Sequence, residues 1–119
     1  MTIQKVGVVG AGQMGNGIAH VFALAGFDVL LNDISTEALT RSIEIMRGNM
    51  VRQVSRGKIT EADMEAALAR ITTTAKLADL GPSDLIIEAA TERETVKVAI
   101  FEDLVPHLKP ATRLSIEQF

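Results

Sequence analysis

Gly10-Ala11-Gly12-Gln13-Met14-Gly15 is the stretch that decides the fold of this 119-residue chain. It follows residues 5–9 (Lys-Val-Gly-Val-Val), whose β-branched side chains predict a buried strand. It opens a stretch at 14–25 whose apolar residues recur with the period of a helix. The pattern G-x-G-x-x-G is weak alone, but between a strand and a helix it indicates a dinucleotide site in a doubly wound α/β fold.

Each glycine of this turn has a separate task. Gly10 allows a sharp turn off the strand, Gly12 lets a diphosphate approach the backbone, and Gly15 lets the helix pack closely on the strand. The helix start, at Gln13 and Met14, then offers unpaired N–H groups to an anion. The alternative is a tight strand-to-helix turn that binds no ligand.

The helix at 14–25 is predicted to be amphipathic. Its apolar stripe would consist of Met14, Ile18, Val21, Phe22 and Ala25. Its other side would carry Gln13, Asn16 and His20. Gly26 follows the last periodic residue, as a C-terminal cap does. We interpret His20 as a solvated helix residue rather than as a metal ligand or a base.

Asp33 indicates which dinucleotide is bound. It ends a predicted strand at 27–32 and follows Gly15 by 18 residues, close to the spacing of the acid that binds the adenosine ribose. A carboxylate there would repel the extra phosphate of NADP, and positions 34–36 contain no arginine to reverse this preference. We therefore expect NAD. The alternative is that Asp33 only caps the next helix together with Ser35.

Composition excludes several other classes of protein. With 47% hydrophobic and 23% charged residues, the chain is predicted to be globular, and we expect residues 1–119 to form one dinucleotide-binding domain. A net charge of −3 argues against a nucleic-acid partner. The absence of cysteine excludes disulfides, and two histidines without ligand spacing predict no metal site. Short apolar runs and no room for a signal peptide predict a cytoplasmic protein without a membrane partner.

The remaining periodicity predicts a helical hairpin between the second and third strands. Ser35 would cap a helix at 36–56 and Thr60 would start a second one reaching residue 69. The apolar stripe of the first helix would be Leu39, Ile43, Met46, Met50 and Val54. Further strands are predicted at 71–74, 84–89 and 113–116, with a helical turn at 76–80 and a helix capped by Thr91 and Glu94 that ends near 105.

Two more groups of residues are candidates for binding. Arg52 and Arg56 are four apart near the hairpin tip, so they point to the same side and could hold the phosphates of a large anionic substrate. The alternative is a solvated basic tip. The loop after the fourth strand, Ala90-Thr91-Glu92, should face the cofactor across from the glycine turn, and Lys97 could reach the same crevice. Alternatively, Glu92 only favours a helix start and Lys97 is a surface residue.

These motifs together resemble 3-hydroxyacyl-CoA dehydrogenases, especially the bacterial 3-hydroxybutyryl-CoA dehydrogenases. The resemblance covers residues 3 to about 115 and rests on residues 8–19, on 87–92 with Val96-Lys97, and on the basic segment 52–58. The family oxidises L-3-hydroxyacyl-CoA to 3-oxoacyl-CoA in fatty acid metabolism, with hydride transfer to NAD. The resemblance implies dinucleotide contacts from Met14, Asp33, Ala90, Thr91, Glu92 and Lys97. It implies coenzyme A contacts from Arg52 and Arg56.

Two departures from the family pattern affect the expected activity. The family continues its fifth strand into a Ser-Asn-Thr-Ser-like segment, whereas residues 116–119 read Ile-Glu-Gln-Phe, with Phe119 about where a serine is expected. The family's histidine–glutamate pair, its later asparagine and its helical dimerisation domain lie beyond the length of this sequence. His20 and His107 are in the wrong places to serve as the general base. We name no catalytic residue, and we expect the chain to be inactive alone.

Two other functions remain open. The chain could be a stand-alone NAD-binding module without chemistry, or a related dehydrogenase of the β-hydroxyacid or 6-phosphogluconate type. Asp33 and the basic hairpin disfavour the second alternative. A sheet that ends at its fifth strand would leave an exposed edge, so we also expect a homo-oligomer or self-association through that edge.

Overall fold

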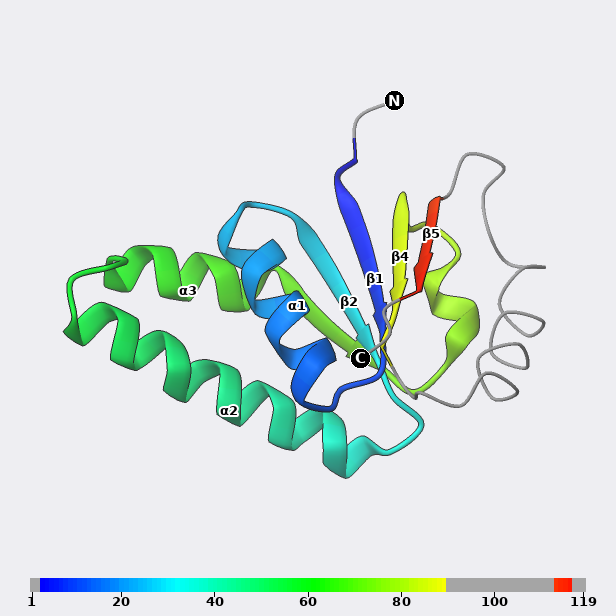
Figure 1. Ribbon diagram of the computed structural model, residues 1–119, viewed down its shortest axis with the longest axis horizontal. Coiled ribbons are helices and arrows are strands. Elements are labelled where there is room, and N and C mark those ends of the chain that lie inside the picture. The colour runs from blue at the N-terminus through cyan, green and yellow to red at the C-terminus, as the bar shows by residue number, and fades with distance from the viewer. Residues whose placement is uncertain (1–2, 90–112, 117–119) are drawn as a thin grey trace.

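The computed structural model describes residues 3–89 and 113–116 of the chain. Within them, five parallel strands form one sheet in the order β3-β2-β1-β4-β5 (Figure 1). The strands are β1 (Lys5–Val9), β2 (Asp28–Asn32), β3 (Ile71–Thr74), β4 (Leu85–Glu88) and β5 (Arg113–Ile116). The predicted doubly wound order is confirmed, with β1 between β2 and β4.

Three helices and one 3-10 turn connect the described strands. They are α1 (Gln13–Leu24), α2 (Thr36–Ser55), α3 (Glu61–Ala69) and the 3-10 turn η1 (Leu77–Leu80). As predicted, α2 and α3 form a hairpin between β2 and β3, and it projects well beyond the sheet (Figure 1). None of these helices is long and apolar enough to cross a membrane. The helix expected from 91 to 105 lies outside the described residues.

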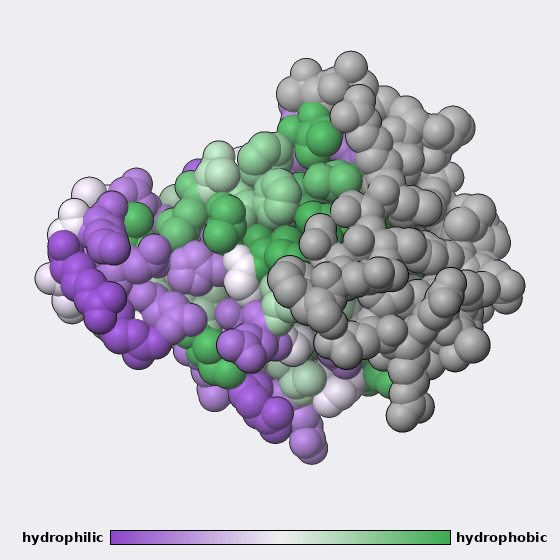
Figure 2. Space-filling view, viewed as in Figure 1, coloured by the Kyte–Doolittle hydropathy of each residue, from purple (hydrophilic) through white to green (hydrophobic). Residues whose placement is uncertain are grey.

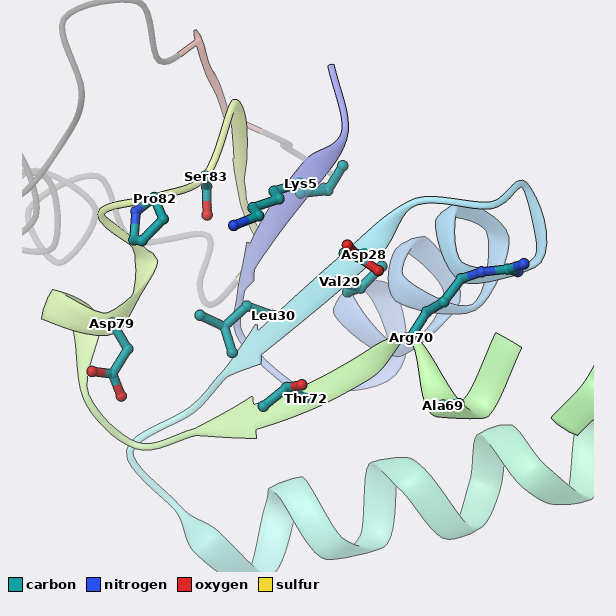
Figure 3. Close-up of a pocket in the computed structure, with 11 residues that line it drawn as sticks. Lys5, Asp28, Val29, Leu30, Ala69, Arg70, Thr72, Asp79, Pro82 and Ser83 are labelled. Carbon is teal, nitrogen blue, oxygen red and sulfur yellow. The ribbon is translucent and has the colours of Figure 1, made fainter. Parts of the chain in front are cut away.

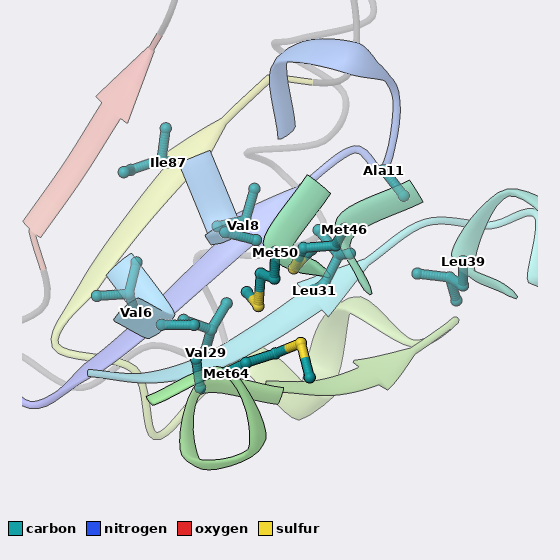
Figure 4. Close-up of a cluster of buried hydrophobic side chains, with 13 residues drawn as sticks. Val6, Val8, Ala11, Val29, Leu31, Leu39, Met46, Met50, Met64 and Ile87 are labelled. Atoms are coloured by element: carbon teal, nitrogen blue, oxygen red, sulfur yellow. The ribbon is translucent and has the colours of Figure 1, made fainter. Parts of the chain in front are cut away.

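The main core lies between the sheet and helices α1, α2 and α3 (Figure 4). The strands contribute Val6, Val8, Val29, Leu31 and Ile87, and the hairpin contributes Met46, Met50 and Met64. A second cluster on the other face joins Val9 and Ile86 to Leu80 of η1. Because both faces of β1 are covered, this strand is a nearly continuous apolar run, as is usual in parallel sheets.

The predicted apolar stripe of α1 is only partly correct, because Ile18 and Phe22 pack against the core but the fully buried residues are others. The residues of α1 that are buried are Gly15, Asn16, Ala19 and Ala23. Val21 is 64% exposed, Ala25 is exposed, and Met14, Ile18 and Phe22 are only half-buried. The reason is the short separation between helix and strand, which leaves room beneath α1 only for small side chains. The periodicity of hydrophobic residues alone therefore does not identify the buried face of α1.

The larger apolar residues of α1 instead form part of the surface. They line a hollow of about 540 Å³ together with Ile87 of β4. Figure 2 shows hydrophobic side chains gathered over this helix in the middle of the view. The hollow is lined by Gln13, Met14, Gly17, Ile18, Val21, Phe22 and Ile87.

The hairpin helices begin and end as their sequences predict. The Ser35 hydroxyl caps α2 by accepting the Ala38 N–H at 3.1 Å, and Gly57 follows the helix with a φ of +71°. At the start of α3, the Thr60 N–H donates to the Asp63 carboxylate and the Asp63 N–H donates to the Thr60 hydroxyl, each at 3.0 Å. The hydrogen bond from the Thr60 N–H to the carboxylate is the main cause of a lowered pKa of Asp63. Leu39, Met46 and Met50 face the core as expected, and Ile43 and Val54 are half-buried.

Candidate dinucleotide site

The glycine turn lies at the carboxyl edge of the sheet, where β1, β2 and β4 all end. β1 ends at Val9, which is in register with Asn32 at the end of β2 and with Glu88 at the end of β4. The strand order runs from β1 to β2 and β3 on one side and to β4 and β5 on the other, so the edge between β1 and β4 is the topological switch point. Ligands of open α/β sheets bind at such an edge.

The backbone of the turn is held by two strands. Gly10 has a φ of +106°, which favours glycine, and its N–H donates to the Asn32 carbonyl at 2.7 Å. Gly12 occupies the N-cap position of α1, and it has no side chain to accept the N–H groups of the first helical turn. A Cβ placed on Gly12 would meet no described heavy atom within 4 Å. The first turn of α1 is therefore open to an anion.

Gly15 occupies the opposite kind of environment. A Cβ there would overlap the carbonyl oxygen of Gly10 and would lie 3.5 Å from Val8 Cγ1. Backbone cannot move aside as the end of a flexible side chain can. Gly15 is therefore required for the contact between α1 and β1, which is the role the sequence predicted for it.

Asp33 is fixed beside the turn by both of its carboxylate oxygens. Oδ2 accepts the Ala11 N–H and Oδ1 accepts the Ser35 N–H, each at 2.9 Å. Asp33 therefore orders the entry to α2, while Ser35 itself caps the helix. Each oxygen accepts one of these N–H groups and keeps further acceptor capacity for ribose hydroxyls.

A hollow of about 560 Å³ separates the glycine turn from α2. Ala11, Gly12, Gln13, Asn16 and Gly17 form one wall. Ala38, Arg41, Ser42, Ile45 and Asn49 form the other. The exposed Gln13 at the start of α1 lines this space, whereas the half-buried Met14 next to it lines the apolar hollow beside Ile87. Among the described residues, no group of histidine, aspartate and glutamate could hold a metal ion.

The sequence matches the family described as 3-hydroxyacyl-CoA dehydrogenase, NAD binding domain, over residues 5–116. The chain belongs to this family. The match confirms the predicted family and its cofactor, NAD, and it removes the β-hydroxyacid and 6-phosphogluconate dehydrogenases as alternatives.

Individual relatives agree with this family assignment. A 3-hydroxybutyryl-CoA dehydrogenase of Bradyrhizobium diazoefficiens is 56% identical over 108 residues, covering 91% of this chain and 37% of that protein. A 3-hydroxyadipyl-CoA dehydrogenase of Escherichia coli is 44% identical, over 97% of this chain and 24% of that protein. The crystal structure of (S)-3-hydroxybutyryl-CoA dehydrogenase from Ralstonia eutropha superposes with a TM-score of 0.93 at 37% identity, over 97% of this chain and 41% of that one. The chain thus spans well under half the length of these relatives.

The two predicted coenzyme A residues of this 3-hydroxyacyl-CoA dehydrogenase domain lie at the far end of α2. Arg52 is in its last turn and Arg56 is its C-cap, and both are exposed. Arg52 donates from Nη2 to Asn49 Oδ1, so its guanidinium lies along the same side of the helix as the hollow. The structure therefore leaves both arginines open to a ligand but places them away from the glycine turn. Ala90, Thr91, Glu92 and Lys97 lie outside the described residues.

Several polar residues of the site were missed or misplaced by the sequence patterns. Asn16, expected on the solvent side, is 6% exposed and donates from Nδ2 to the Ser42 carbonyl at 2.6 Å and to the Ser42 hydroxyl at 2.7 Å. Ser42 lies between Leu39 and Met46 on the buried side of α2, and that spacing was the available signal. His20 is half-buried and its Nε2 pairs with Gln53 Oε1 at 2.8 Å. Glu88, which is fully buried at the end of β4, was not singled out.

A second polar cavity of about 330 Å³ is separate from this site (Figure 3). It lies over the sheet near η1, and its lining includes Lys5, Asp28, Arg70 and Asp79. No residue predicted to bind the cofactor or coenzyme A lines it. Its lining includes Lys5 and Asp28, the first residues of β1 and β2, whereas the glycine turn lies at the opposite ends of these strands.

The contrast between Gly15 and Gly17, two residues apart in α1, gives a test of the helix–strand contact. Gly15→Ala should destabilise the fold by about 3 kcal/mol or more, because the new methyl group overlaps backbone. Gly17→Ala is the matched control: its Cβ meets nothing within 4 Å, so it should stabilise α1 by about 0.5–1 kcal/mol. Urea unfolding of both variants measures the difference. Equal stabilities would show that α1 does not approach β1 as closely as described.

Proposed function

We propose that this chain, as a single domain of residues 1–119, is the NAD-binding part of an enzyme that oxidises an L-3-hydroxyacyl-CoA. The proposal rests on a contrast between two glycines of the turn. A Cβ at Gly15 would overlap the Gly10 carbonyl, whereas a Cβ at Gly12 would meet no described atom within 4 Å, which leaves space there for a ligand. Asp33 adds a fixed carboxylate next to that opening. The family match and the similarity to 3-hydroxybutyryl-CoA dehydrogenases support the assignment, with 3-hydroxybutyryl-CoA as the favoured substrate.

The residues around the turn would bind and orient the dinucleotide. The N–H groups that begin α1, at Gln13 and Met14, would bind the diphosphate, and Gly12 would allow its approach. Asp33 would accept hydrogen bonds from the adenosine ribose and disfavour the 2′-phosphate of NADP. Ala90, Thr91, Glu92 and Lys97 complete the proposed set. When bound, NAD supplies a hydride acceptor for the substrate carbon.

Arg52 and Arg56 are proposed to bind the phosphates of coenzyme A. Both guanidinium groups are exposed near one end of α2, where they are free to pair with phosphate oxygens. Guanidinium groups match phosphate geometry better than ammonium groups do. The acyl-CoA would then extend from this end of α2 toward the carboxyl edge of the sheet.

The NAD assignment is tested by Gly12→Ala. The backbone at Gly12 has φ −74° and ψ −167°, which alanine adopts easily, and the methyl group meets no described neighbour, so the variant should stay folded. Alanine is a poorer N-cap residue than glycine, so its stability should fall by about 1 kcal/mol at most. Affinity for NAD should fall about tenfold or more, equivalent to roughly 1.4 kcal/mol, because the methyl occupies the diphosphate path. Calorimetry with NAD and NADP on the native chain and the variant measures this.

Gly48→Ala serves as the control for that experiment, since it adds the same methyl group to a helix, would meet only Arg52 Nη1 at 3.9 Å, and does not line the hollow. The native chain should bind NAD more tightly than NADP because of Asp33. Unchanged NAD affinity in Gly12→Ala, or equal affinity for the two dinucleotides, would contradict the proposed site.

Oxidation of the substrate also requires a base to take the alcohol proton, and we propose that this chain alone lacks it. The one histidine among residues 3–89, His20, pairs with Gln53 on the α1–α2 side rather than at the carboxyl edge. The chain mixed with NAD and 3-hydroxybutyryl-CoA should therefore bind NAD without producing NADH, as followed by NADH fluorescence. Steady NADH production would overturn the proposal that catalytic groups lie elsewhere. A stand-alone NAD-binding module would give the same null activity but no affinity for acyl-CoA.

We propose further that the protein acts in the cytoplasm on fatty acid metabolites and self-associates. The absence of cysteine means that the chain draws no stability from an oxidising compartment. β5 is one edge of the described sheet, and an edge strand exposes unpaired backbone groups. Light scattering should show dimers or larger species. A monomer over the whole concentration range would exclude pairing through this edge.

A further inference from the structure

One side of α2 faces the glycine turn across the hollow of about 560 Å³. Ala38, Arg41, Ile45 and Asn49 recur at steps of three and four residues and line the hollow opposite Gly12. Among the described residues that line this hollow, Arg41 is the only one that carries a charge. The glycine turn thus faces a single guanidinium across a space of about 560 Å³.

The position of Arg41 relative to the turn is fixed by its neighbour in sequence. Ser42 is buried, and both its carbonyl and its hydroxyl accept hydrogen bonds from the Asn16 side chain. Asn16 directly follows Gly15, so this link joins the first turn of α1 to the turn of α2 that carries Arg41. The two walls of the hollow therefore cannot separate without breaking a buried polar contact, which is costly.

Arg41 also has a guanidinium that is available to a ligand. Its side chain is exposed, and no carboxylate of residues 3–89 forms an ion pair with it. Glu37 and Glu44 line a neighbouring surface depression, which Arg41 also lines, so Arg41 lies between these two carboxylates and the hollow. An arginine beside an open helix N-terminus provides the planar donor fork that phosphate oxygens accept.

We propose that Arg41 binds the diphosphate of the dinucleotide from the side of α2, opposite the N–H groups of α1. The inference rests on the proposed function, because it requires NAD at the glycine turn. The diphosphate of coenzyme A is the less suitable ligand: Arg52, the nearer of the two coenzyme A residues, lies 11 residues along the helix, or roughly 16 Å away. Asn16 acts here as a positioning residue that holds the α2 wall.

The test is Arg41→Gln, with Arg47→Gln as a matched control. Both residues are exposed arginines of α2, but Arg47 lies about 240° around the helix from Arg41 and does not line the hollow. Affinities for NAD, ADP and adenosine are measured by displacement calorimetry. Arg41→Gln should lower the affinities for NAD and ADP about fivefold to tenfold and leave the affinity for adenosine unchanged. The loss caused by the substitution should be smaller at high salt. Arg47→Gln should change none of these affinities, and Arg41→Lys should retain part of the binding.

Each other outcome overturns the inference. An equal loss for adenosine would mean that Arg41 contacts the nucleoside or supports the site indirectly. A loss of coenzyme A affinity with NAD affinity unchanged would assign Arg41 to the substrate. Unchanged NAD affinity in Arg41→Gln would reject the inference while leaving the proposed function intact, provided that Gly12→Ala still weakens NAD. If the native chain does not bind NAD, the proposed function fails as well.

Discussion

The contact between Gly15 of α1 and the carbonyl of Gly10 is the constraint on which the rest of this site depends. Because no side chain separates helix from strand there, α1 begins immediately at the carboxyl edge of the sheet. Its first N–H groups therefore point into the space beyond β1, where a diphosphate can reach them. The same closeness selects Ala19 and Ala23 for the buried face and leaves the larger apolar residues at its margins.

Two polar links extend this constraint from α1 to its neighbours. Asp33 ties the Ala11 N–H to the end of β2, and Asn16 ties the first turn of α1 to Ser42 of α2. Both links lie within a few residues of the glycines, so the turn, the acid and the α2 wall form one rigid unit. A site preorganised in this way loses little conformational freedom when its ligand binds.

Much of this arrangement could be predicted from sequence because its signals are local. The glycine spacing, the Ser35 and Thr60 caps and the regular stripe of α2 each depend on residues a few positions apart, and all were confirmed. The burial of Asn16 could not be predicted in the same way, since it depends on how α1 lies against α2. The stripe of α1 was only partly correct for a related reason. Hydrophobic periodicity presumes an ordinary distance between helix and sheet, whereas at Gly15 the helix lies closer to the strand.

The straightness and length of α2 have a consequence for how the sequence can vary. This one helix of 20 residues carries both Arg41, beside the glycine turn, and Arg52, near the hairpin tip. Inserting one residue between them would rotate the tip by about 100° and turn Arg52 and Arg56 away from the face they share with Arg41. Insertions and deletions within α2 are therefore incompatible with a ligand that spans it, whereas the connection at 57–60 can change in length without altering that alignment.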